Sequence, residues 1–217
     1  MTCCWGYDRM IIDVGWMKKM SFYGFAKVVT RGILSVIFHM QYRGCENVPQ
    51  EGGFIVACNH QSYLDPVIAA QKIPHQLRFM AKAELFKVPV LGFVIRHLNA
   101  FPVERGKGDT GAIDYAVETI KSRHCLLIFP EGTRSKTGEL LRPRSGISVI
   151  AHRTGADVLP VSIAFTHGRR FRFKVVVTYG EVIPYAELGL QEGTPSEIKG
   201  ASRMIMEKIQ KQRDSSF

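Results

Sequence analysis

The chain has 217 residues, of which 46% are hydrophobic and 22% charged, and its formal net charge at pH 7 is +10. This length and hydrophobic content exclude a disordered chain and are typical of one domain with a small appendage. The positive charge favours anionic partners, which include acidic lipids, phosphorylated substrates, nucleic acids and acidic proteins.

The cysteines give no framework for cross-links. They are five in number and show no CxxC spacing: Cys3, Cys4, Cys45, Cys58 and Cys125. We therefore expect a reducing, cytosolic compartment, with Cys58 and Cys125 packed as small hydrophobic residues. No stretch approaches the ~20 apolar residues that a membrane-spanning helix needs. Asp8 and Asp13 interrupt the start of the chain, which therefore does not resemble a signal peptide.

Residues 1–20 carry no pattern that can be interpreted, whereas residues 21–40 predict an amphipathic helix. Its apolar stripe, at spacings of three and four, consists of Phe22, Phe25, Val29, Ile33, Val36 and Met40. Lys27 and Arg31 lie off that stripe. Such a basic helix either lies in a membrane interface or packs on the protein's own core. The upstream pair Lys18-Lys19 favours the membrane, so we expect residues 1–43 to be a membrane-associating helical segment.

From residue 44 to residue 217 the chain predicts one further domain. After a loop over 44–53, apolar runs predict strands over 54–58, 77–81, 99–103, 125–129, 158–165 and 171–179. Helices are expected over 66–71, 84–97 with an interruption at Pro89, 109–122, 147–153 with Gly155 at its end, and 195–213. Strands that alternate with helices indicate an α/β fold with a mixed, largely parallel sheet flanked by helices.

The first chemically suggestive segment is Asn59-His60-Gln61-Ser62-Tyr63-Leu64-Asp65-Pro66, directly after a buried strand, where α/β folds tend to bind ligands. His60 can act as a general base, and Asp65 can fix its tautomer through one ring nitrogen. If Ser62 caps the following helix with Asp65 at its third position, His60 lies just outside that helix. The alternative is a capped helix and a hydrogen-bonded histidine without catalytic role. A lone His and Asp are too few for a catalytic zinc, and Cys58 lies in an apolar run, which argues against a cysteine nucleophile.

The second segment, Phe129-Pro130-Glu131-Gly132-Thr133-Arg134-Ser135, follows the most apolar strand. Gly132 allows an unusual backbone turn, and the planar guanidinium of Arg134 matches phosphate oxygens. Thr133 and Ser135 add hydroxyl donors. Glu131 could orient an arginine or accept a hydrogen bond from a substrate hydroxyl. Taken alone, the segment is equally well explained as a turn with a surface arginine.

Taken together, the two segments resemble the His-x4-Asp and FPEGTRS motifs of the glycerolipid acyltransferase family, in the family's order. Further similar blocks are 79–85, 101–105, 158–163 and 179–184, so the resemblance covers about residues 44–185. It is greatest to the bacterial 1-acylglycerol-3-phosphate acyltransferase group. One departure is Glu104, which stands where the family more often has an aspartate.

The resemblance implies transfer of a fatty-acyl group to lysophosphatidic acid from acyl-CoA or acyl-acyl carrier protein. It makes His60 the base and Asp65 its orienting partner, with Arg134 the first choice for the phosphate, then Lys82 and Arg105. The rest of the second motif, Glu131, Gly132, Thr133 and Ser135, is expected at the substrate. No metal or other cofactor is implied, because the acyl thioester is a co-substrate.

The expected location is the cytoplasmic side of the cell membrane, on an anionic surface and without a spanning helix. Arg142 and Arg144 could face lipid headgroups or the acyl donor, and residues 85–98 could line an acyl groove or simply fill the core. Other functions stay open: acylation of glycerol-3-phosphate or another lysolipid, thioester hydrolysis, or membrane binding without catalysis. No nucleic-acid-binding motif is present, so we expect no nucleic-acid partner.

Overall fold

The computed structural model describes residues 22–103, 110–166 and 173–217. Their centre is a seven-stranded sheet with the order β1-β7-β6-β2-β5-β3-β4. The strands are β1 (His39–Arg43), β2 (Ile55–Cys58), β3 (Leu77–Lys82), β4 (Ala100–Val103), β5 (Cys125–Ile128), β6 (Val158–Thr166) and β7 (Lys174–Tyr179). β6, β2, β5, β3 and β4 are parallel, whereas β7 is antiparallel to β6 and β1 runs parallel to β7. The predicted mixed, largely parallel sheet is therefore confirmed.

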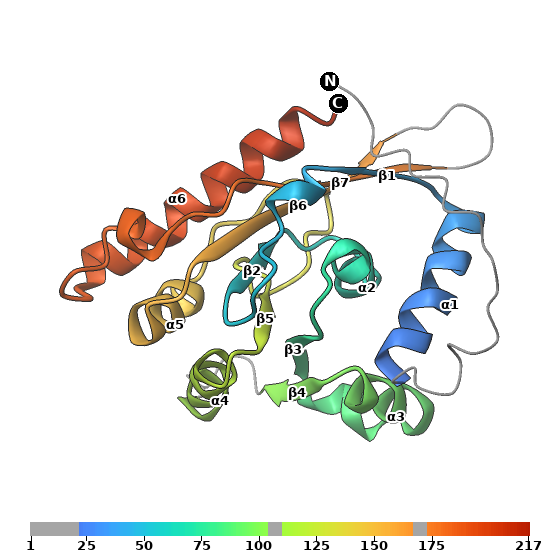
Figure 1. Ribbon diagram of the computed structural model, residues 1–217, viewed down its shortest axis with the longest axis horizontal. Coiled ribbons are helices and arrows are strands. Elements are labelled where there is room, and N and C mark those ends of the chain that lie inside the picture. Colours follow the sequence, from blue (N-terminus) through green and yellow to red (C-terminus); the bar gives the residue numbers. More distant parts are fainter. Residues whose placement is uncertain (1–21, 104–109, 167–172) are drawn as a thin grey trace.

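Helices cover both faces of this sheet (Figure 1). α4 (Thr110–Lys121), α5 (Gly146–Thr154) and α6 (Pro195–Asp214) pack on one face, while α1 (Phe22–Ile37) and α2 (Asp65–Ala69) pack on the other. The remaining helical segments are α3 (Pro89–His97) and the short 3-10 turns η2 (Cys45–Asn47), η3 (Ala70–Lys72), η4 (Ala83–Lys87) and η5 (Tyr185–Leu188). Strand β2 shows why two cores form: Ile55 and Ala57 join the first, Val56 and Cys58 the second, because successive side chains alternate across a strand.

Two helix ends are fixed by capping interactions, of which the sequence analysis identified one. α5 ends where predicted, because Gly155 adopts the left-handed conformation (φ 66°) that glycine tolerates best. α6 begins with a capping box, in which the Thr194 side chain accepts from the Glu197 amide and the Glu197 carboxylate accepts from the Thr194 amide. The sequence reading did not identify this second signal.

Two predicted boundaries are wrong. The first helix ends at Ile37 rather than at Met40, and residues 39–43 form the edge strand β1, paired with β7. The expected boundary at residue 43 thus falls after a strand of the sheet. Pro89 starts α3 instead of interrupting a helix, since its missing amide proton is harmless in the first turn. Residues 1–20, 104–105 and 171–172, about which the sequence made predictions, lie outside the described residues.

The topology places two loops side by side. β2 and β5 are neighbouring parallel strands, so their carboxyl ends meet at the same edge of the sheet. The chain leaves β2 toward α2 on one face and leaves β5 toward α5 on the other. In open α/β sheets, such a divergence opens a crevice in which ligands bind. Both segments singled out in the sequence lie in these loops.

Candidate active site

The centre of the site is a hydrogen bond between His60 and Asp65. His60 Nδ1 lies 2.9 Å from Asp65 Oδ2, and the carboxylate is fully buried. With the Nδ1 proton donated to the carboxylate, the lone pair of a neutral imidazole lies on Nε2. Among the described residues, none bonds Nε2, and the imidazole side chain is 10% exposed. The ring is therefore oriented by the protein on one side and open for a ligand on the other.

Asp65 does not form the expected capping box with Ser62. Leu64, not Ser62, is the N-cap of α2, and no side chain caps that helix. Instead Asp65 Oδ2 accepts from the backbone amides of Gln61 at 2.6 Å and Ser62 at 2.7 Å, in addition to His60. The Ser62 hydroxyl accepts from the Leu64 amide at 3.1 Å. The carboxylate thus folds the His60 loop back over the first turn of α2, which is why residues five apart can meet.

Glu131 joins the second segment to the first. Its Oε1 accepts from the His60 amide at 2.8 Å, and its Oε2 accepts from the Leu141 amide at 2.9 Å. The Ser135 amide donates to the His60 carbonyl at 2.8 Å, so both backbone groups of His60 are held by this segment. Burial raises the pKa of Glu131, an effect that these amides and His60 oppose. In place of the arginine suggested by the sequence, Glu131 binds backbone amides and braces the loop that carries His60.

Neighbouring side chains fix the His60 loop further. The Phe129 ring stacks on the imidazole with 4.0 Å between centroids and 19° between planes. The buried Asn59 side chain pairs with the backbone of Ile163, donating to its carbonyl at 3.0 Å and accepting from its amide at 2.8 Å. Gln61 Nε2 donates to the same carbonyl at 2.7 Å. These contacts tie β2, β5 and β6 together around the imidazole.

Arg134 lies beside the first segment through an aromatic contact. Its guanidinium carbon is 3.4 Å from the ring centroid of Tyr63, which is 71% exposed. A cation–π contact of this kind orients the guanidinium and leaves its edge donors open. Gly132 adopts φ +67°, and a Cβ there would lie 2.6 Å from Cδ of Arg144, so only glycine permits this approach. The second motif thus holds Arg134 next to the His60 loop and lets Arg144 approach its turn at Gly132.

The remaining predicted site residues are less closely associated. Lys82 ends β3 at the same edge of the sheet, but it is half exposed and forms an ion pair with Glu84 at 3.1 Å. Thr133 is exposed, and Ser135 is buried with no hydrogen-bond partner for its hydroxyl among the described atoms. Arg105 lies outside the described residues. The structure therefore brings together His60, Asp65, Glu131, Ser135 and Arg134, and leaves Lys82 paired elsewhere.

Two other chemistries weighed in the sequence gain no support here. Cys58 is fully buried, and desolvation, followed by the charges of Asp65 and Glu131, raises the pKa of its thiol well above the ordinary value. A thiolate nucleophile is therefore disfavoured. Within the described residues, no cluster of three His, Cys, Asp or Glu side chains has the spacing of a metal site.

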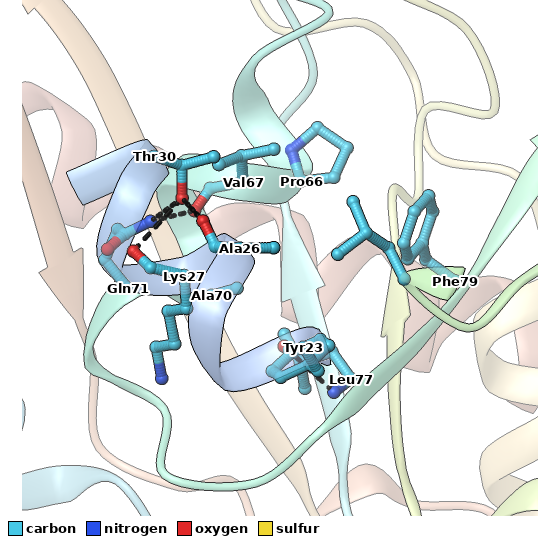
Figure 2. A pocket seen from close by; sticks show the side chains of 11 residues that line it. Tyr23, Ala26, Lys27, Thr30, Pro66, Val67, Ala70, Gln71, Leu77 and Phe79 are labelled. Atoms are coloured by element: carbon cyan, nitrogen blue, oxygen red, sulfur yellow. Dashed lines mark hydrogen bonds between the residues drawn. The ribbon is translucent and has the colours of Figure 1, made fainter. Parts of the chain in front are cut away.

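An apolar groove begins next to the site. Pro66 and Val67, which directly follow Asp65, line a shallow groove between α1, α2 and β3 that is open to solvent and has a cavity volume of about 50 Å³. Figure 2 shows the groove with Phe79 on one side and α1 on the other. Of the described side chains among residues 85–98, which the sequence suggested as groove lining, Leu98 is the one that lines it.

Sequence reasoning missed three contacts that shape the site. Phe129 and Tyr63 stand within the quoted motifs, but nothing in the order of residues shows that one stacks on His60 and the other on Arg134. Asn59 precedes His60 directly, and its polar side chain at the end of a buried strand is a signal that should have indicated a backbone clamp.

Known proteins resemble this chain in sequence over the range that contains the site. A protein-family model described as Acyltransferase matches residues 39–164, a range that contains both motifs. The 1-acyl-sn-glycerol-3-phosphate acyltransferase of Bacillus subtilis is 30% identical over 141 residues, which cover 64% of this chain and 70% of that protein. A protein of the same name from Streptococcus pneumoniae is 27% identical over 81% of this chain and 62% of its own length. The match to a chloroplastic relative from Brassica napus covers 37% of that protein's length.

A solved structure shows the same fold. The crystal structure of the 1-acyl-sn-glycerophosphate (LPA) acyltransferase PlsC from Thermotoga maritima superimposes with a TM-score of 0.65. The two sequences are 28% identical, and the match covers 82% of this chain and 72% of the other.

Proposed function

Because the chain belongs to the acyltransferase family, we propose that it transfers a fatty-acyl group to the 2-hydroxyl of 1-acylglycerol-3-phosphate. The donor is an acyl thioester, either acyl-CoA or acyl-acyl carrier protein, and the product is phosphatidic acid for phospholipid synthesis. The names of its relatives support the acceptor. The observation that carries the chemistry is the 2.9 Å bond from His60 Nδ1 to a buried carboxylate, with Nε2 left open.

His60 is the base in this reaction. An alcohol is a poor nucleophile at neutral pH, so it must lose its proton as it attacks. The acceptor hydroxyl gives that proton to His60 Nε2 while its oxygen bonds to the thioester carbonyl carbon, forming a tetrahedral oxyanion. The intermediate collapses by breaking the C–S bond, and the leaving thiolate takes the proton from His60. The exchange needs no electron carrier, so we propose that the thioester co-substrate is sufficient without a cofactor.

Asp65 orients and stabilises the imidazole. A carboxylate on Nδ1 fixes the tautomer and stabilises the imidazolium that forms during attack. Because the same oxygen accepts from two further amides, the carboxylate cannot rotate away without breaking three hydrogen bonds. The geometry needed for proton transfer is therefore present before the substrates bind.

Arg134 is the proposed holder of the acceptor phosphate. The phosphate is attached to the glycerol carbon next to the one that bears the reacting hydroxyl, so it must lie near His60. A guanidinium oriented by Tyr63 on the same loop fits this requirement and binds phosphate oxygens in a fork. Gly132, Thr133 and Ser135 complete the phosphate-facing turn, with Lys82 and Arg105 as additional cations. The apolar groove beside Pro66 would contact part of an acyl chain.

α1 is the proposed membrane contact, because its apolar side faces outward. Seven large hydrophobic side chains on α1 are exposed: Phe22, Phe25, Val28, Val29, Ile33, Val36 and Ile37. Of the stripe predicted in the sequence, the five members within α1 are among these, and Leu34 is the one residue of α1 that is buried. These five side chains are 42–75% exposed, which favours a contact outside the protein over packing of the stripe on the core. An exposed apolar face of this extent is typical of a surface that meets lipid.

Polar side chains attach α1 to the rest of the protein (Figure 2). Arg31 donates to the carbonyl of Gln71 at 3.0 Å, and Lys27 donates to the carbonyl of Ile73 at 2.5 Å. The Tyr23 hydroxyl accepts from the Leu77 amide at 3.2 Å. None of the helices in the described residues is long and apolar enough to span a bilayer. These contacts support a peripheral position, which we propose to be the cytoplasmic, anionic face of the cell membrane.

Product analysis tests the proposal. Purified protein is incubated with palmitoyl-CoA or palmitoyl-acyl carrier protein and a panel of acceptors, and the products are identified by mass spectrometry. We expect phosphatidic acid from lysophosphatidic acid, and a large loss of it with Asp65→Asn, which keeps the side-chain shape and removes the charge. Acylation of glycerol-3-phosphate or another lysolipid alone would reassign the acceptor. Release of free fatty acid without acceptor would indicate a thioesterase, and vesicle binding without turnover would indicate a membrane-binding protein.

A further inference from the structure

A second groove lies on the opposite side of the site from α1. It has a volume of about 680 Å³ and is lined by Arg142, Pro143, Ser145, Lys199, Ser202 and Arg203. Its volume falls within the range of about 300–1,000 Å³ typical of small-molecule sites. Its base is rigid, because Ser202 on α6 is buried and shares a 2.7 Å hydrogen bond with Ser148 on α5. We call it the basic groove.

Within the described residues, the cations of the basic groove have no acidic partners. In the part of the chain that the structure describes, no carboxylate forms an ion pair with Arg142, Lys199 or Arg203. Glu197 has its carboxylate engaged in the capping box of α6, and Glu207 lies one turn beyond Arg203 without an ion pair to it. Lys199 and Arg203 stand four residues apart on one helix face, where like charges repel. A multivalent anion in the groove would relieve this repulsion.

The basic groove begins beside the candidate active site. The Leu141 amide donates to Glu131 at 2.9 Å, and the Arg144 amide donates to the Pro130 carbonyl at 2.8 Å. The segment 141–144 therefore lies along the turn that braces the His60 loop. Two of the groove's residues, Arg142 and Pro143, are in this segment, so the groove borders the candidate site on the face of the sheet that α5 and α6 cover.

The site thus lies between an apolar groove and a basic groove, on opposite faces of the sheet. An acyl-CoA molecule has the matching order of parts: an apolar chain, the thioester, a long uncharged pantetheine arm and a 3′-phosphorylated adenosine diphosphate. The phosphate of lysophosphatidic acid, by contrast, must stay close to the reacting hydroxyl, where Arg134 lies. Cations placed further from the imidazole therefore fit the donor better than the acceptor.

We propose that the basic groove binds the 3′-phosphorylated adenosine diphosphate of coenzyme A, an inference that rests on the acyl transfer proposed above. The groove is concave and of nucleotide size, with three cations for the phosphates and a proline ring for the base. A carrier protein would require a broad surface, about 800 Å² on each partner in a standard interface. The groove accordingly favours acyl-CoA as the donor.

Donor kinetics test this proposal. The groove variant Lys199→Gln/Arg203→Gln is compared with Lys208→Gln/Lys211→Gln, which removes the same charge from exposed positions of the same helix outside the groove. The donors are palmitoyl-CoA, palmitoyl-acyl carrier protein and palmitoyl-pantetheine, the last of which has the same thioester but no nucleotide. For the groove variant we expect the KM for palmitoyl-CoA to rise about tenfold, equivalent to about 1.4 kcal/mol. Its KM values for palmitoyl-pantetheine and lysophosphatidic acid should change less than about twofold, as should all values for the control.

Any other pattern of KM values overturns the nucleotide assignment. An unchanged KM for palmitoyl-CoA, or an equal rise in KM for palmitoyl-CoA and palmitoyl-pantetheine, would show that the groove does not bind the nucleotide. A rise for palmitoyl-acyl carrier protein alone would assign the groove to an acidic carrier protein. If the wild type transfers acyl groups from no donor, the proposed function fails, and calorimetric titration with adenosine 3′,5′-bisphosphate still tests the groove. Binding to the wild type that the groove variant loses would support it, and no binding to the wild type would refute it.

Discussion

Glu131→Gln should weaken the bracing of the His60 loop while leaving the His60 and Asp65 side chains themselves unchanged. In the wild type, the two carboxylate oxygens accept from the amides of His60 and Leu141, and the side chain is 2% exposed. Glutamine keeps one acceptor and turns an amino group toward the other amide. A lost hydrogen bond to a charged group costs about 1.5–3 kcal/mol, and an unsatisfied buried donor adds about 1 kcal/mol or more.

Removal of the charge offsets part of this cost, because burial raises the pKa of Glu131 and so disfavours its ionised form. We expect a net loss of about 2 kcal/mol in the free energy of unfolding, which lowers Tm by about 4–8 °C in a protein of this size. Thermal unfolding followed by circular dichroism measures it, with the exposed Glu139→Gln as control. Because the His60 backbone loses an anchor, kcat should fall as well. Equal Tm and kcat in both variants and the wild type would refute the bracing role.

Three further predictions follow from particular contacts. Arg134→Ala should raise the KM for lysophosphatidic acid by about tenfold or more with a smaller change in kcat; a change in thermal stability alone would make Arg134 structural. Burial, followed by repulsion from neighbouring cations, lowers the pKa of Lys27 to about 8, so between pH 8 and 10.5 the unfolded chain binds more protons than the native protein. Stability should therefore rise with pH across this window, by about 1 kcal/mol after allowance for solvent screening, and urea unfolding of Lys27→Met should show no such rise. Ile33→Glu/Val36→Glu should reduce sedimentation with anionic vesicles about tenfold or more, since each side chain contributes about 1.5 kcal/mol on burial; unchanged sedimentation would contradict the membrane contact.

The elements governed by local pattern could be predicted from the sequence. Short apolar runs identified the central strands, because both faces of a largely parallel sheet are buried. Gly155 identified the end of α5. The family resemblance drawn from the two motifs is confirmed by the family model and the relatives.

The predictions that were wrong concern features set by contacts between segments far apart in the sequence. Met40 continues the helical spacing of the first stripe, yet its segment pairs with β7, which lies far along the chain. Periodicity located the apolar stripe of α1 but could not show that the polar side faces the protein, because Arg31 and its neighbours find their acceptors on another element. The pattern around Ser62 allowed a capping box, but only the bond from the Ser62 amide to the Asp65 carboxylate forms, because the Ser62 hydroxyl accepts from Leu64 rather than from Asp65. The partners of Glu131 likewise follow from the adjacency of β2 and β5.

The central claim is that His60 activates the acceptor hydroxyl while Asp65 holds it in position. The direct measurement is the rate of phosphatidic acid formation by His60→Ala and by His60→Gln, which retains a donor toward Asp65, at saturating substrates. Circular dichroism and Tm establish that each variant is folded. We predict that kcat falls about 10²-fold or more in each of the two variants, which is the range that general base catalysis contributes. A folded His60→Ala protein that forms phosphatidic acid at a near-normal rate would contradict it.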